Sequence, residues 1–236
     1  IEFKKNGVNP LILDTRKEPS SNIISEAKNL GIEIKFSHVV VAAKGYKKVK
    51  SADIAKISDN KKDLSNIENI ECDCICVSGF WTPSIHLASQ SGNKSEFNEK
   101  IDAFIPKKSK QKENTIGSAN GKFTLEETIN EAFDKGYEVS NKITENNNKV
   151  SIPTVVEKKS TEHDKFWCVP LPKGKSYKRF LDFQNDVAVT DIELALREGF
   201  RSIEHVKRYT TLGMATDQGK TSNLNGLQLV SDIENK

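Results

Sequence analysis

Residues 207–226, with the sequence KRYTTLGMATDQGKTSNLNG, form a polar loop between two amphipathic helical patterns and decide how the C-terminal part of the chain folds. Glycines at 213, 219 and 226 alternate with threonine, serine, aspartate and asparagine, which favour turns and bond to nearby backbone. Such a loop can turn several backbone N–H groups toward one bound group. We therefore treat it as a candidate binding loop.

The Gly-Lys-Thr sequence at 219–221 suggests the phosphate loop of nucleotide hydrolases. That motif requires a glycine, four residues and then Gly-Lys-Ser/Thr, directly after a strand. Five residues separate Gly213 from Gly219, and a helical pattern precedes the loop. Both differences argue against a P-loop enzyme.

Three short helices are predicted around this loop. Thr190 and Glu193 have the spacing of a capping box, and the helix they open is expected to end at Gly199. Ser202 is expected to cap a second helix, and apolar residues between 224 and 233 predict a third. The sequence thus predicts a small α-helical module over residues 173–236.

The N-terminal part instead alternates strand and helix. A strand at 10–14 ends in Asp14, a helix at 22–30 follows with Ser20 or Ser21 as cap, and residues 32–36 form another strand. Strand, helix and strand in this order predict a parallel pair with a right-handed crossover. In dinucleotide folds an acid at the end of such a strand binds the adenosine ribose. Asp14 is the candidate here, and a solvated strand end is the alternative.

A β-rich stretch is predicted from His38 to Ile57, followed by a polar turn or loop over 59–69 and a buried strand over 72–77. Cys72, Cys74 and Cys76 alternate on that last strand, so their thiols would share one face and pack as small hydrophobes. No metal site and no disulfide are expected from them.

Two glycine-containing turns are further candidates for contact with a cofactor. The first follows the cysteine strand and contains Ser78, Gly79 and Trp81, although Trp81 could equally pack under a loop. The second is Gly117, Ser118, Ala119, Asn120 and Gly121. It precedes a helix opened by a capping box of Thr124 and Glu127, which leaves room for a phosphate at the helix N-terminus. That helix is expected to end at Gly136.

The composition of the chain limits which partners and which class of protein are expected. The chain has 236 residues and a net charge of +3, from 36 basic and 33 acidic side chains. This balance predicts neither a nucleic acid nor a membrane as partner, and no apolar run is long enough to span a bilayer. We expect an α/β fold in which residues 1–143 are part of a two-dinucleotide-binding domain of the pyridine nucleotide-disulfide oxidoreductase type. Residues 144–172 are expected to be a linker with one or two short strands, followed by the helical module. We expect the whole chain to be a piece of a longer polypeptide.

Four stretches together resemble the alpha-subunit family of heterotetrameric sarcosine oxidases. They are DFQNDV at 182–187, REGFRSIEHVKRYTTLGMATDQGKTSN at 197–223, VSGFWTPSIHLASQSG at 77–92 and IGSANGKF at 116–123. The resemblance covers nearly the whole chain and is weakest over 137–172. The C-terminal stretch is its most specific part.

The resemblance implies an oxidoreductase acting on the CH–NH group of sarcosine, which forms glycine, hydrogen peroxide and methylene-tetrahydrofolate. It implies FAD in the beta subunit, FMN at the alpha–beta interface, NAD bound by the alpha subunit and tetrahydrofolate in a C-terminal domain beyond this chain. Beta, gamma and delta subunits would be the partners in a cytoplasmic complex. This piece would carry no catalytic residue. The alternatives are a related amine, opine or proline dehydrogenase complex and a non-catalytic scaffold.

The helical module also resembles the [2Fe-2S] domain of bacterioferritin-associated ferredoxin. The resemblance places Asp182, Gln184, Asp217 and Ser222 at the four ligand positions. None is a thiolate or imidazole, the ligands that such clusters use, so we expect a module without a cluster. The loop would instead contact a flavin phosphate or serve only as an interface. The residues expected to do so are Gln218, Gly219, Lys220, Thr221 and Ser222.

Overall fold

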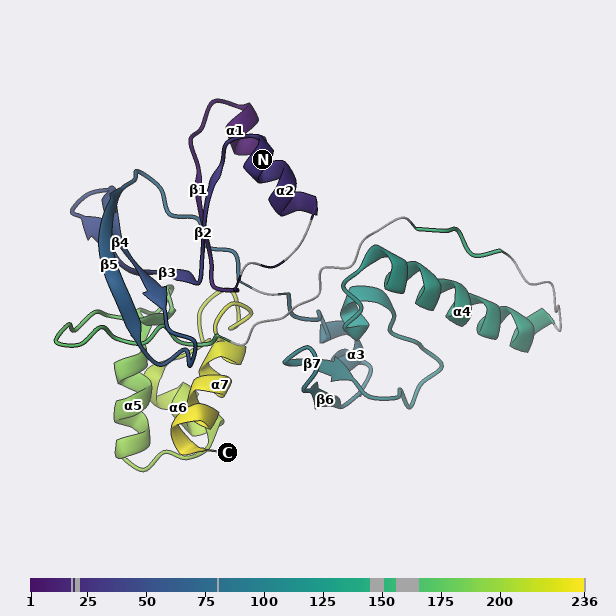
Figure 1. The fold of residues 1–236 in the computed structure, drawn as a ribbon. Coiled ribbons are helices and arrows are strands. Elements are labelled where there is room, and N and C mark those ends of the chain that lie inside the picture. The colour runs from purple at the N-terminus through teal and green to yellow at the C-terminus, as the bar shows by residue number, and fades with distance from the viewer. Residues whose placement is uncertain (18, 20–21, 80, 145–150, 156–165, 236) are drawn as a thin grey trace. The chain divides into compact units, whose positions relative to one another are not determined.

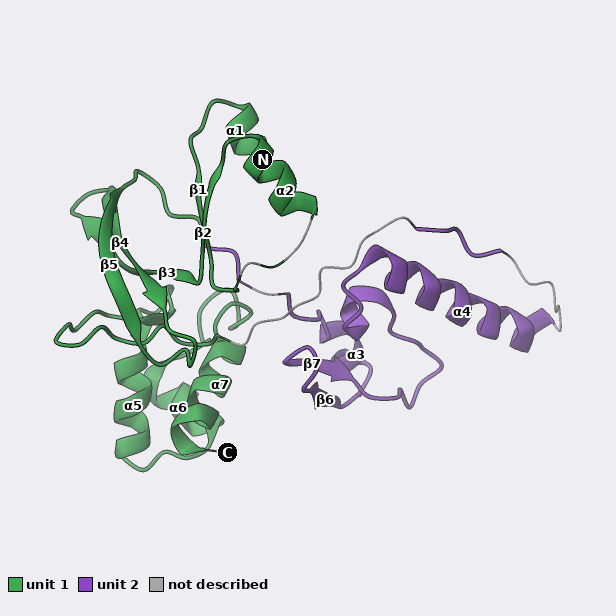
Figure 2. Cartoon of the chain, in the orientation of Figure 1, with its two compact units in different colours: residues 1–76, 164–236 green, residues 77–163 purple. Residues whose placement is uncertain are grey.

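The structure, a computed structural model, describes residues 1–17, 19, 22–79, 81–144, 151–155 and 166–235 (Figure 1). The chain divides into two compact units (Figure 2). Residues 1–76 and 164–236 form unit 1, and residues 77–163 form unit 2. Unit 2 is therefore inserted into the sequence of unit 1. The boundaries of these units differ from those of the domains expected above. The expected domains remain a prediction.

Unit 1 begins with the predicted strand–helix–strand. After α1 (Glu2–Lys5), strand β1 (Leu11–Asp14) pairs in parallel with β2 (Glu33–Phe36), and α2 (Asn22–Asn29) connects them. Gly31 ends the connection with φ of 68°, a left-handed conformation that glycine adopts without strain. The parallel pair is confirmed. Ser20 and Ser21, the predicted caps of α2, lie outside the described residues.

An antiparallel meander of β3 (His38–Gly45), β4 (Val49–Ile57) and β5 (Leu64–Glu71) follows. The predicted loop over 59–69 is wrong from Leu64 onward, because this segment pairs with β4. The polar side chains of β5 do not alternate regularly with apolar ones, so its sequence lacks the usual pattern of a strand. It forms a strand because its backbone groups bond to those of β4, the central strand of the meander. Ile54 and Ala55 of β4 are buried.

The predicted buried strand at 72–77 is also wrong. Residues 74–79 form no strand, Cys74 and Cys76 are exposed, and Val77 is 88% exposed. An apolar run becomes a strand only when another strand satisfies its backbone groups, and no described strand pairs with this one. Burial of these thiols therefore does not follow from their alternation.

The helical module lies at the C-terminal end of unit 1. It contains β8 (Phe180–Asp182), β9 (Val187–Ala188), α5 (Val189–Arg197), α6 (Ile203–Thr210) and α7 (Asn223–Glu234). The three helices pack around a buried cluster that includes Ile192, Ala195, Val206, Leu212 and Leu229. All three predicted helices are confirmed.

The predicted capping box of α5 is wrong in its residues. The helix begins at Val189, and the N–H of Ala188 donates to the Asp191 carboxylate at 2.8 Å. Thr190 is therefore already inside the helix. The start is set by the pairing of β8 with β9, which places Val187 in the core directly before the helix.

Unit 2 contains α3 (His86–Gln90), the hairpin β6 (Ser95–Asn98) and β7 (Ala103–Pro106), the 3₁₀ turn η1 (Gly117–Asn120) and the long helix α4 (Leu125–Thr144). The start of α4 is as predicted, since the Glu127 N–H donates to Thr124 Oγ1 at 3.2 Å. Its end is not, because the helix continues through Gly136 to Thr144. One glycine costs a helix interior about 1 kcal/mol, and the ion pairs of Glu138 with Lys135 and Lys142 help to offset it. The described residues 151–155 and 166–172 of the expected linker contain no strand.

Candidate functional site

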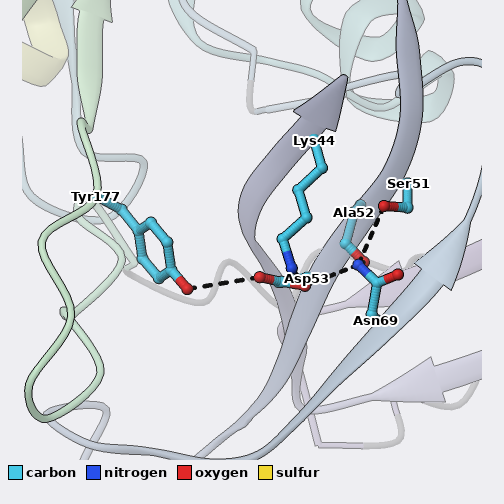
Figure 3. Close-up of polar contacts among 6 residues, drawn as sticks. All are labelled: Lys44, Ser51, Ala52, Asp53, Asn69 and Tyr177. Carbon is cyan, nitrogen blue, oxygen red and sulfur yellow. Dashed lines mark hydrogen bonds and ion pairs between the residues drawn. The ribbon is translucent and has the colours of Figure 1, made fainter. Parts of the chain in front are cut away.

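A buried carboxylate on the central strand of the meander joins the two sequence segments of unit 1 (Figure 3). Asp53 Oδ1 lies 2.7 Å from Lys44 Nζ and accepts a bond from Asn69 Nδ2 at 2.8 Å. The hydroxyl of Tyr177 donates to Oδ2 at 3.5 Å. Hydrogen bonds from Lys44, then Asn69, outweigh burial and hold the pKa of Asp53 below its ordinary value. An ionised Asp53 therefore ties the segment before β8 to the meander.

Sequence reasoning missed Asp53. The signal was available, because it lies within the apolar alternation of a predicted strand, where a carboxylate needs a partner. Its partners come from β3, β5 and a segment more than 100 residues away, so only the fold identifies them.

Asp14 lies at the carboxyl end of β1, as predicted, and is engaged by Arg16. Its Oδ1 accepts from the Arg16 backbone N–H at 2.9 Å and from Nε at 3.0 Å, while Oδ2 accepts from Nη2 at 2.8 Å. Burial alone would raise the pKa of Asp14, but these bonds and the charge of Arg16 hold it below its ordinary value. The carboxylate is therefore fixed in orientation and ionised.

The turn at 117–121 is closed by a carboxylate of α4. Glu131 accepts from the Gly117 N–H at 2.7 Å and from Asn120 Nδ2 at 2.7 Å. Gly121 has φ of 78°, and a Cβ there would lie 2.7 Å from Ile101 Cδ1, so this position requires glycine. Ser118 is exposed and Ala119 half-buried. A phosphate at this turn would compete with Glu131 for the Gly117 N–H.

Ser78, Gly79 and Trp81 lie at the start of unit 2 in an irregular segment. Ser78 and Gly79 are exposed, and the Trp81 side chain is 77% exposed. Within unit 2 the ring of Trp81 is thus not packed under a loop. It remains available to a ligand or another protein segment.

The glycine-rich loop is organised by the buried carboxylate of Asp182. Its Oδ2 accepts from the Gly213 N–H at 2.8 Å and from Ser222 Oγ at 3.5 Å. Its Oδ1 accepts from the backbone N–H groups of Gln184 at 2.9 Å and Asn185 at 3.2 Å. The carboxylate thus joins β8, the loop and the residue that precedes α7. The fold brings Asp182 and Ser222, two of the four cluster-ligand positions, into direct contact.

The other two positions also make hydrogen bonds inside the loop region. Gln184 Oε1 accepts from Thr216 Oγ1 at 2.7 Å. Asp217 accepts from Thr221 Oγ1 at 2.7 Å and from the Gly219 N–H at 3.1 Å, and these bonds, the hydroxyl first, hold its pKa below the ordinary value. Among the described residues no group of three or more His, Cys, Asp or Glu side chains could hold a metal ion.

Asn223, at the start of α7, explains why two loop positions are glycine. A Cβ at Gly213 would lie 2.0 Å from Asn223 Oδ1, and one at Gly219 would lie 2.2 Å from Nδ2. Both glycines have positive φ, at 66° and 72°. The loop therefore closes tightly on the first turn of α7.

The predicted flavin-phosphate contacts differ in exposure. Gln218 and Lys220 are exposed, whereas Gly219 is buried and Ser222 is completely buried against Asp182. The Thr221 hydroxyl is already used by Asp217. Gln218 and Lys220 are thus the side chains of this set that can meet a ligand without rearrangement.

Comparison with known proteins finds sarcosine oxidase sequences. Residues 176–236 match the family model of the sarcosine oxidase A3 domain. The chain is 34% identical over 165 residues to sarcosine oxidase subunit alpha of Rhizobium meliloti (strain 1021), covering 70% of the chain and 16% of the relative. It is 29% identical over 195 residues to the alpha subunit of Corynebacterium sp. (strain U-96), covering 78% and 19%. The chain thus spans less than a quarter of these relatives' length.

Among solved structures, the fold is similar to that of L-proline dehydrogenase from P. horikoshii. The TM-score is 0.51 at 20% identity, and the match covers 96% of this chain and 45% of that one. This likeness supports a mixed helix and strand architecture. None of the helices in the described residues combines the length and the apolar composition of a membrane-spanning segment.

Replacing Asp182 by alanine is expected to destabilise the helical module by about 3 kcal/mol, because it leaves the Gly213 N–H and other buried donors without an acceptor. Asp217→Ala serves as control and should cost about 1 kcal/mol, since its carboxylate is partly exposed. Urea denaturation measures both. Equal losses in the two variants would contradict the central role of Asp182.

Asp53→Asn should change how stability depends on pH. The lowered pKa means that Asp53 stabilises the fold above its unfolded value of about 3.9 and loses this contribution as pH falls below it. The difference in melting temperature between wild type and Asp53→Asn should therefore be largest at neutral pH and shrink below about pH 4. Asp59→Asn, at an exposed ion pair with Lys17, is the control and should show little difference at any pH. A gap at Asp53 that stays constant down to pH 3 would rule out this role.

Proposed function

Because the chain corresponds to a segment of the alpha subunit of the sarcosine oxidase family, we propose that it belongs to a complex that oxidises sarcosine to glycine. The reaction would release hydrogen peroxide and pass the one-carbon unit to tetrahydrofolate. The observation that carries the proposal is the A3-domain match, which coincides with the module built around Asp182. This chain would bind nucleotides and partners, while substrate oxidation would occur at FAD in the beta subunit.

The proposed NAD site uses Asp14 at the end of β1. Two hydrogen bonds from Arg16 reach Oδ1 and one reaches Oδ2, so Oδ2 can still accept a bond from a ribose hydroxyl. Arg16 holds the carboxylate rigidly, which reduces the entropy lost when the ribose binds. The parallel pair β1–β2 supplies the strand end at which dinucleotide folds bind this group.

Unit 2 carries candidate nucleotide contacts of its own. We assign Ser78, Gly79 and Trp81 to the approach of the cofactor, since they are exposed and Trp81 offers a large flat surface. The turn from Gly117 to Gly121 would face a phosphate through Ser118 and backbone donors. A phosphate bound at this turn would have to displace Glu131 from the Gly117 N–H. The phosphate contact is therefore the weaker part of the assignment for unit 2.

The glycine-rich loop would face FMN at the interface with the beta subunit. Lys220 is exposed and can pair with a phosphate, and Gln218 can donate a hydrogen bond from its amide. Gly219, Thr221 and Ser222 would act mainly by fixing the loop, as their contacts with Asn223, Asp217 and Asp182 indicate. Beta, gamma and delta subunits in a cytoplasmic heterotetramer, and a folate domain beyond this chain, complete the proposal.

A related amine, opine or proline dehydrogenase complex is the second candidate. The fold likeness to L-proline dehydrogenase fits it, but at 20% identity this likeness shows architecture alone. The relatives named above favour sarcosine oxidase, at up to 34% identity. A scaffold that uses its nucleotide only for stability would have the same fold as either.

The substrate assignment predicts the activity of the complete complex. Purified with all its subunits, it should form hydrogen peroxide from sarcosine and oxygen, with a kcat/KM at least about tenfold higher for sarcosine than for proline, a preference of about 1.4 kcal/mol. Peroxide release and glycine formation measure it. A preference for proline would instead favour the second candidate.

The nucleotide assignment predicts that the denatured complex releases NAD. Asp14→Ala should weaken NAD binding roughly ten- to a hundredfold, because a hydrogen bond to a charged group contributes about 1.5–3 kcal/mol. Chromatography of the released nucleotide gives the occupancy after equilibration at several NAD concentrations. Asp59→Ala, an exposed carboxylate of the same unit, should leave occupancy unchanged. Absence of NAD from the wild-type complex would reject the site.

A further inference from the structure

Two exposed thiols lie in contact near the end of the first sequence segment of unit 1. Cys74 Sγ lies 3.8 Å from Cys76 Sγ, and both side chains are exposed. In an extended segment, residues two apart point to the same side, which accounts for the contact across Ile75. The alternation that predicted buried thiols therefore produces a neighbouring pair that faces solvent.

The backbone around this pair is not held in a sheet. The last backbone hydrogen bond before it joins the Cys72 N–H to the Lys50 carbonyl at 3.1 Å. Between described residues, positions 73–79 make no backbone–backbone hydrogen bond and belong to no helix or strand. A disulfide has an S–S distance of about 2.05 Å, so the two sulfurs need to approach each other by roughly 1.8 Å. No ladder hydrogen bond has to break for that movement.

The other two cysteines of the chain are placed differently. Cys72 is partly buried, and no hydrogen bond joins its thiol to another described residue. Cys168 is also partly buried and accepts a hydrogen bond from Arg179 Nη1 at 3.2 Å. Burial raises the pKa of the Cys168 thiol, which keeps it protonated and unreactive. Cys72 and Cys168 thus serve as internal controls for the pair.

Two adjacent thiols can bind a soft metal ion or join as a disulfide. Zinc sites in proteins use three or four protein ligands. Among the described residues, no group of three or more His, Cys, Asp or Glu side chains could hold a metal ion, so Cys74 and Cys76 lack the further ligands. Disulfide formation needs only the two thiols and an oxidant.

We propose that Cys74 and Cys76 are a modification site, a dithiol that hydrogen peroxide oxidises to an intramolecular disulfide. One sulfur attacks a peroxide oxygen as its thiolate, the O–O bond breaks, and the departing hydroxide takes up the thiol proton to form water. The other thiol attacks the resulting sulfenic acid, the S–O bond breaks, and a second water leaves as the S–S bond forms. The two thiols lose two electrons and two protons, and one hydrogen peroxide is reduced to two waters.

The surroundings of the pair determine how fast and how reversibly it reacts. The hydrogen bond with the Cys76 thiol, followed by the charges of Cys76 and Asp73, raises the pKa of Cys74. Because the thiolate is the nucleophile, oxidation at neutral pH is slower than at a cysteine whose pKa is lowered. The ring of the disulfide would enclose only Ile75 and would be exposed, and strained or exposed disulfides are readily reduced. The modification is therefore slow and reversible.

The position of the pair relates it to the proposed cofactor contacts. Cys76 is the last residue of the first segment of unit 1, two residues before Ser78 and three before Gly79. Ring closure stiffens the chain directly before these candidate contacts. For the source of the oxidant, the inference rests on the proposed function, which forms hydrogen peroxide. The site itself depends on neither the substrate nor a bound nucleotide.

Thiol labelling of the complete complex, reduced beforehand and kept without sarcosine, tests the proposal. Iodoacetamide should alkylate both Cys74 and Cys76 in the native complex, as their exposure requires. After treatment with millimolar hydrogen peroxide, alkylation of both in the denatured protein should fall together, on the order of tenfold. Mass spectrometry should show that their peptide has lost two hydrogens, and dithiothreitol should restore both labels.

Serine variants identify the partners in the bond. Cys74→Ser and Cys76→Ser should each abolish the loss of two hydrogens. Cys72→Ser is the matched control from the same peptide and should still show it, while labelling of Cys168 should not change. No alkylation of the pair in the native complex would overturn the proposal. Retention of both labels after peroxide, a disulfide to Cys72, or irreversible sulfinic acid at one cysteine would do the same. Since peroxide is added as a reagent, failure here is distinct from failure of the sarcosine or nucleotide assignments.

Discussion

The C-terminal module depends on one buried carboxylate. Asp182 lies at the end of β8 and accepts hydrogen bonds from its own turn, from Gly213 in the loop and from Ser222 before α7. A buried carboxylate without partners would be strongly unfavourable, and the loop supplies the Gly213 N–H and the Ser222 hydroxyl to it. The positive φ values of Gly213 and Gly219 and the close fit of Asn223 are consistent with that requirement. The loop is thus shaped by the donors that converge on Asp182.

A second buried carboxylate joins parts of unit 1 that are distant in sequence. Asp53 forms an ion pair with Lys44 and accepts a hydrogen bond from Asn69, both on neighbouring strands. It also accepts one from Tyr177, which follows the inserted unit in the sequence. Its lowered pKa keeps it ionised, so the ion pair with Lys44 persists at neutral pH. Asp14 with Arg16 and Glu131 with the turn at 117–120 follow the same pattern. In this protein buried or partly buried carboxylates hold strands and turns in place, while Lys220 of the glycine-rich loop remains exposed.

Local patterns predicted much of the fold. The parallel pair around α2, the start of α4 and the three C-terminal helices follow from periodicity, caps and glycines that act over a few residues. Strand β5 and the segment 72–77 were predicted wrongly because a segment forms a strand only when a neighbouring strand pairs with its backbone. A polar segment beside β4 becomes a strand, and an apolar segment with no described partner does not. The end of α4 was missed because Gly136 lowers helix stability without stopping the helix, which is supported there by the ion pairs of Glu138 with Lys135 and Lys142.

The sequence by itself determined the family resemblance, the order of local elements and the absence of thiolates at Asp182, Gln184, Asp217 and Ser222. These properties are read from residue identity and short spacing. Only the tertiary structure decided that Ser222 is buried against Asp182 while Lys220 is exposed, that Glu131 occupies the Gly117 N–H, and that Asp53 meets Tyr177. Each of these depends on which groups the packed chain brings within hydrogen-bond distance, and residues far apart in sequence supply the partners.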